Sequence, residues 1–129
     1  MNRKLLGRMV AGLAIAYAGA ASAQGVSFKD KTVTIGIGSS TGGGLDTYGR
    51  LVARHFGRHI PGAPSVVASN MPGAGGGIVA GHLYNIAPKD GTFIGLVFPG
   101  IIVEPLLQES LRKTYDPSRF NYVGNAHSE

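Results

Sequence analysis

Two glycine clusters, at residues 42–44 and 73–77, constrain this chain more than any other feature of its sequence. Each cluster follows a short run typical of a β-strand and precedes a longer run typical of a helix. Glycine lets the backbone turn sharply and lets another group approach without a Cβ in the way. A strand, a glycine turn and a helix therefore occur twice in succession, which predicts an α/β fold with a parallel sheet.

The remaining elements continue this alternation. Val33, Ile35 and Ile37 alternate with Thr and Gly, which predicts the first strand over residues 31–37. The strand expected over residues 92–98 is nearly all apolar, so we place it at the centre of the sheet. The other expected strands and helices cover residues 65–69, 120–123, 45–59, 78–87 and 101–112. The order predicts a mostly parallel sheet with flanking helices.

The N-terminal residues have the pattern of a secretory signal peptide. Three basic residues lie within the first eight, residues 9–20 are apolar and mostly small, and residues 21–23 form an Ala-x-Ala cleavage site. The apolar stretch is shorter than the ~20 residues that span a membrane. We therefore expect a cleaved signal peptide at residues 1–23 and a periplasmic mature chain over residues 24–129.

Charge and composition exclude several kinds of function. Of the 12 Lys and Arg residues, three precede residue 24, which leaves too small an excess over the 7 Asp and Glu for a nucleic-acid partner. The absence of Cys excludes disulfides, thiolate metal sites and cysteine nucleophiles. His55 and His59 have metal-compatible spacing but no nearby acid, so we expect no metal site. No P-loop lysine, nucleophile elbow or nucleophile–base pair is found, and we expect no catalytic residue and no cofactor.

The two glycine turns predict an anion-binding site. Turns that follow neighbouring parallel strands meet at the carboxyl edge of the sheet, where α/β proteins bind ligands. Free backbone N–H groups at the start of each helix attract a carboxylate or phosphate. Alternatively, the glycines only make tight strand-to-helix turns. The candidate ligand-binding residues are Ser39, Ser40, Thr41, Gly42, Gly43, Gly44, Asp46, Asn70, Gly73, Ala74, Gly75 and Gly76.

Two charged features beside the first turn are interpreted separately. Asp46 would repel a carboxylate, so we expect it to support the first helical turn and to accept loop N–H groups. Arg50, Arg54 and Arg58 lie at i, i+4 and i+8, which predicts a solvated helix face.

Three segments in order carry a family resemblance. They are Gly42-Gly43-Gly44-Leu45-Asp46 followed by Arg50-Leu51, then Asn70-Met71-Pro72-Gly73-Ala74-Gly75-Gly76, and then Ala87-Pro88-Lys89-Asp90-Gly91-Thr92. Over residues 31–124 the chain resembles the solute-binding receptors of tripartite tricarboxylate transporters, the Bug family. The resemblance implies an incomplete lobe of a class II-like periplasmic binding protein, and two loops that hold a small carboxylate partly through bridging water. It also implies inner-membrane permease subunits as partners and no catalysis.

The chain departs from this family in two respects. Residues 39–41, Ser-Ser-Thr, replace the usual proline-containing approach to the first glycine run, which leaves the ligand class open. Family members are also much longer than residues 24–129, so we expect the N-terminal part of a solute-binding domain that binds weakly or not at all by itself. The alternatives are an exported α/β enzyme and a truncated, non-functional gene product.

Overall fold

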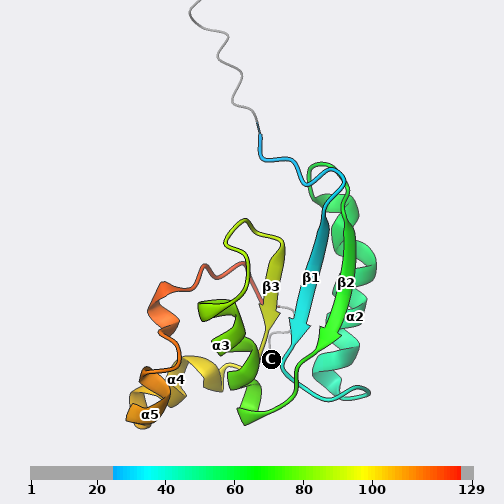
Figure 1. Cartoon of the computed structure of the whole chain (residues 1–129). Helices are drawn as coiled ribbons and strands as arrows, with labels where there is room; N and C mark the ends of the chain where they lie inside the picture. Colours follow the sequence, from blue (N-terminus) through cyan, green and yellow to red (C-terminus); the bar gives the residue numbers. More distant parts are fainter. Residues whose placement is uncertain (1–24, 126–129) are drawn as a thin grey trace, which may run out of the picture.

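The computed structural model describes residues 25–125, in which three parallel strands form one sheet (Figure 1). The order β2-β1-β3 follows from strands β1 (Thr32–Ile37), β2 (Ser65–Asn70) and β3 (Phe93–Leu96). The helical elements are α2 (Gly44–Phe56), η1 (Gly57–His59), η2 (Ala74–Gly76), α3 (Gly77–Asn85), α4 (Gly100–Leu107), α5 (Glu109–Arg112) and η3 (Pro117–Arg119). The expected parallel sheet with flanking helices is confirmed, and the predicted signal peptide lies outside the described residues.

Helices α2 and α3 cover opposite faces of the sheet. A Cβ added at Gly49 of α2 would lie 2.6 Å from the side chain of Ile37. A Cβ at Gly95 would lie 3.1 Å from Val79 of α3, on the other face. The chain passes from β1 through α2 to β2 on one side, and then from β2 through α3 to β3 on the other side of β1. Because both crossovers have the same hand but run in opposite directions across the sheet, the two helices lie on opposite faces. Figure 1 shows the two helices on either side of the strands.

Strand β1, and not β3, is the central strand. The side chains of Val33, Ile35 and Ile37 are almost fully buried, as their alternation predicts. The prediction that residues 92–98 form the central strand is wrong, because β3 pairs with β1 alone among the described strands. All four residues of β3 are only partly buried. An apolar composition therefore predicts that a segment is a strand, but it does not predict how many strands pair with it.

The helix predicted over residues 101–112 is divided in two. Gln108 has extended backbone angles, φ −125° and ψ 106°, and separates α4 from α5. Pro105 inside α4 lacks the N–H that would bond the carbonyl of Ile101. The hydroxyl of Tyr115 donates to that carbonyl at 3.3 Å instead. Ile101 is only 2% exposed, so its buried carbonyl keeps a partner that the helix itself cannot supply.

The strand predicted over residues 120–123 is also wrong. This segment follows η3 and is irregular, and the side chains of Tyr122 and Val123 are exposed. Phe120 is instead partly buried, with its ring stacked on Tyr115 at 6.1 Å between centroids. Short apolar runs do not distinguish a strand from a coil that is anchored by one aromatic ring.

Candidate functional site

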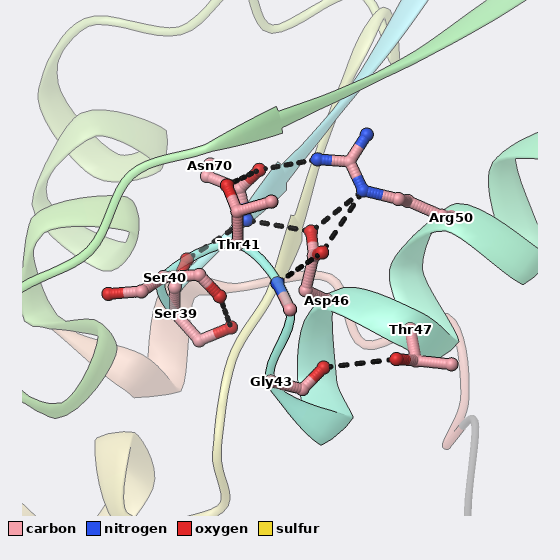
Figure 2. Close-up of polar contacts among 9 residues, drawn as sticks. Ser39, Ser40, Thr41, Gly43, Asp46, Thr47, Arg50 and Asn70 are labelled. Carbon is pink, nitrogen blue, oxygen red and sulfur yellow. Dashed lines mark hydrogen bonds and ion pairs between the residues drawn. The ribbon is translucent and has the colours of Figure 1, made fainter.

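The first turn, residues 38–43, joins β1 to α2 and is ordered by Asp46 (Figure 2). Asp46 is the third residue of α2 and is 3% exposed. Its carboxylate accepts a hydrogen bond from the N–H of Gly42 at 2.9 Å. Gly42 has φ +88°, a conformation that favours glycine. The expectation that Asp46 accepts a loop N–H is confirmed.

Arg50 is paired with the same carboxylate. Its Nε donates to the two oxygens of Asp46 at 3.0 and 3.1 Å, one helical turn along α2. Its Nη2 donates to Oδ1 of Asn70 at 2.7 Å. Arg50 is therefore ion-paired while its side chain stays 40% exposed, and Arg54 and Arg58 are exposed as the predicted solvated face requires. The i, i+4 spacing of an acid and a base was the available signal for this pair.

Asn70, the last residue of β2, connects that strand to the first turn and to α2. Its Nδ2 donates to the carbonyl of Ser39 at 3.0 Å and to Oδ1 of Asp46 at 2.8 Å. Its Oδ1 accepts from Nη2 of Arg50 and, at 3.3 Å, from the hydroxyl of Thr41. Both N–H groups of the Asn70 amide are thus bonded within the protein. In this arrangement Asn70 holds the turn and does not offer a donor to a ligand.

The second turn, residues 71–76, lies against the first. A Cβ added at Gly38 would be 2.9 Å from the Cα of Gly76, so the two backbones are in contact. The N–H of Met71 also donates to the carbonyl of Ile37 at 2.8 Å. All four residues from Gly73 to Gly76 have positive φ, at 130°, 47°, 59° and 102°. The prediction that both turns meet at the carboxyl edge of the sheet is confirmed.

Most backbone donors of the first turn have no acceptor within the described part of the chain. The N–H of Gly42 is bonded to Asp46, and the hydroxyl of Ser39 makes a long contact of 3.4 Å with the carbonyl of Ser40. Residues 40–44 are exposed. The N–H groups that make no hydrogen bond among residues 25–125 are those of Ser39, Ser40, Thr41, Gly43 and Gly44. These donors extend to Gly44, the first residue of α2.

The second turn is more closed and has an acid beside it. The N–H groups of Gly76 and Gly77 donate to carbonyls of the same turn. Glu104 of α4 lies over this turn, with Oε1 3.2 Å from the position of a Cβ on Gly75. The Glu104 carboxylate forms no hydrogen bond or ion pair with any described residue. The N–H groups of this turn without an acceptor in the described chain are those of Gly73, Ala74 and Gly75. Sequence reasoning missed Glu104, because its approach depends on how α4 packs.

Hydrogen bonds keep Asp46 ionised. The bond from Arg50 is the largest cause, followed by the N–H of Gly42 and the amide of Asn70. Together they lower the pKa of Asp46 from 3.8 to about 2. At neutral pH the Asp46–Arg50 pair therefore has no net charge. The positive end of the α2 dipole remains beside the unbonded N–H groups.

Other kinds of site were also compared with the geometry. Within residues 25–125, no three His, Asp or Glu side chains lie close enough together to hold a metal ion. None of the described helices is long and apolar enough to cross a membrane. A hollow of about 640 Å³ lies between α4 and the segment after it, and one of about 420 Å³ lies beside α3. Neither hollow includes a residue of the first turn.

Comparisons with family models, curated proteins and solved structures found no match to this chain. The resemblance of the three sequence segments to the Bug family stays a prediction. The geometry of the two turns is therefore the basis on which function is argued.

Proposed function

We propose that this chain acts as part of a periplasmic solute-binding receptor that captures a small carboxylate for a tripartite tricarboxylate-type transporter. Its partners in this proposal are the inner-membrane permease subunits. The observation that carries the proposal is the set of N–H groups at residues 39–41, 43 and 44 that make no hydrogen bond within residues 25–125, at the start of α2 and beside the second turn. The proposal includes no catalytic step.

A carboxylate matches these donors in charge and in hydrogen-bonding capacity. Consecutive backbone N–H groups ahead of a helix form a concave set of donors that favours an anion. The partial positive charge at the start of α2 acts in the same direction. The hydroxyl of Ser40 has no partner among the described residues and is exposed, so it adds a neutral donor at the edge of the set. The position of Glu104 beside the second turn supports the first turn as the main anion contact.

Gly44 offers a selective test, because its backbone N–H donor can be removed by substitution without disturbing the fold. It is the first residue of α2, and nothing lies within 4 Å of a Cβ placed on it. Proline is favoured at this helix position because the N–H that it lacks would have no partner within the helix. The preceding residue, Gly43, has the extended angles φ −78° and ψ 169° that a following proline requires. Gly44→Pro therefore deletes one candidate donor, and Gly44→Ala is the matched control that keeps it.

The test is a titration of the full chain with citrate, followed by ¹⁵N chemical shifts of the backbone amides, with glycerol as an uncharged comparison. We expect saturable shifts confined to residues 39–44 and the second turn, with weak, roughly millimolar affinity, since few groups contact the ligand. Gly44→Pro is expected to weaken binding about fivefold or more, whereas Gly44→Ala leaves it unchanged. Equal affinities for both variants, or shifts scattered over the surface, would refute the proposed site.

A further inference from the structure

The start of α2 holds a negative charge where an anion receptor requires a positive one. Asp46 is buried in the first helical turn and is ionised at neutral pH. The positive end of a helix is equivalent to roughly +0.5 of an elementary charge. One full negative charge beside it would leave this end negative overall. The unbonded N–H groups would then face a potential that repels a carboxylate.

We infer that Arg50 is a positioning residue of this site, which neutralises Asp46 and so keeps the first turn attractive to an anion. The inference rests on the proposed function, since it assigns a role within the same site. Nε of Arg50 lies within 3.1 Å of both carboxylate oxygens. No other cation forms an ion pair with Asp46 in the described part of the chain. Compensation of the charge therefore depends on one side chain.

Arg50 also sets the direction in which the backbone of the first turn points. Its Nη2 bonds Oδ1 of Asn70, which leaves the amide Nδ2 to donate to the carbonyl of Ser39. In a planar trans peptide, the C=O of one residue and the N–H of the next point in opposite directions. Figure 2 shows the contact between Asn70 and Ser39. Fixing the carbonyl of Ser39 toward Asn70 therefore directs the N–H of Ser40, an exposed residue, away from Asn70.

Only a guanidinium makes these contacts together. The Nε–H of the planar Arg50 guanidinium is shared between the two oxygens of Asp46, and its Nη2 donates to Oδ1 of Asn70. A lysine ammonium is a compact point charge without that fork, so Arg50→Lys should keep the charge but lose the orientation. Arg54 is one turn further along the helix, exposed and without an acidic partner among the described residues, so it provides a control with the same charge change.

The test compares sulfate and citrate binding, by amide chemical shifts, in the full chain and four variants. Arg50→Gln is expected to lower affinity about tenfold or more, because an uncompensated charge then lies beside the anion. Arg54→Gln is expected to change it less than about threefold, as for an exposed charge in salt. The double variant Asp46→Asn with Arg50→Gln is expected to bind within about threefold of the native chain, since both charges are gone. Asp46→Asn alone should bind as well as the native chain or better.

The double variant separates a charge role from a structural one. If it binds as weakly as Arg50→Gln, the loss of affinity comes from the lost orientation or fold and not from the charge, and the inferred neutralisation is overturned. A second readout distinguishes this failure from that of the proposed function. If the native chain binds no anion, the receptor proposal fails, but the carboxyl titration of Asp46, followed by ¹³C shifts, still tests the neutralisation. Arg50→Gln must raise the pKa of Asp46 while Arg54→Gln leaves it in place; an unchanged pKa in Arg50→Gln rejects the inference.

Discussion

Replacing Asn70 with alanine is expected to release the first turn from β2. The side chain makes four hydrogen bonds, and two of them join the ionised partners Asp46 and Arg50. A bond to a charged group contributes about 1.5–3 kcal/mol, and the neutral bonds to Ser39 and Thr41 about 1 kcal/mol or less. Asn70 is only partly buried, so water replaces some of these contacts. We therefore expect Asn70→Ala to lower the free energy of unfolding by about 2–4 kcal/mol, a large share of a typical stability of ~5–15 kcal/mol.

Equilibrium unfolding in urea, followed by far-UV circular dichroism, measures this loss as a lower midpoint at an unchanged slope. Asn85→Ala is the matched control. Its amide also donates two bonds, to the carbonyls of Gly81 at 3.0 Å and Thr114 at 2.9 Å, but it is exposed and both acceptors are neutral. We expect a loss of about 1 kcal/mol there. Equal losses at the two positions would show that the charged network adds nothing, and the reasoning about Asn70 would be refuted.

Three further predictions concern the same chain and are measured by urea unfolding. Gly38→Ala places a Cβ 2.9 Å from the backbone of the second turn and should lower the free energy of unfolding by about 1–3 kcal/mol. Gly44→Ala places a Cβ in open space at the start of a helix and should leave that free energy unchanged or raise it by up to about 1 kcal/mol. An unchanged stability in Gly38→Ala would mean that the turns are not in contact. The pKa of Asp46 is lowered to about 2 from 3.8, so its contribution is present above about pH 4 and is lost as the pH falls toward 2. Asp46→Asn should accordingly reduce the loss of stability between pH 5 and pH 2.5, and an unchanged pH profile would contradict this. Tyr115→Phe leaves the carbonyl of Ile101 without its donor and should cost about 1–3 kcal/mol, and a cost near zero would mean that the carbonyl had another partner.

Local patterns in the sequence were sufficient to locate most elements but not to place them relative to one another. The alternation of Val33, Ile35 and Ile37 predicted a strand with one buried face, and those side chains are buried. The apolar run at residues 92–98 gave the wrong position in the sheet, because the neighbours of a strand depend on the path of the crossovers. The hydroxyl of Tyr115 supplies the hydrogen bond to Ile101 that Pro105 cannot make. Tyr115 lies ten residues beyond Pro105, so no pattern within the helix predicts this contact.

The candidate site was predictable to the extent that it is built from adjacent residues. The two glycine turns and the supporting role of Asp46 follow from local backbone chemistry. The i, i+4 spacing of Asp46 and Arg50 is typical of an ion pair on a helix, and the two residues form one. The interpretation of the arginines as a solvated face did not include this pair. Asn70 has its partners 20–31 residues away, and Glu104 reaches the second turn from another helix. Such contacts depend on the packed fold and on no local pattern.

The network of Asp46, Arg50 and Asn70 divides the work of the site between side chains and main chain. An acid at the start of α2 opposes anion binding, but it bonds the N–H of Gly42 and so orders a turn in which glycines would otherwise leave the backbone free. Arg50 removes the electrostatic penalty of that acid. In the proposed receptor the side chains then act as a scaffold, and the backbone N–H groups of residues 39–41, 43 and 44 recognise the solute. Loss of Asn70 or of Arg50 alone should therefore lower stability and affinity together, whereas Gly44→Pro should lower affinity alone.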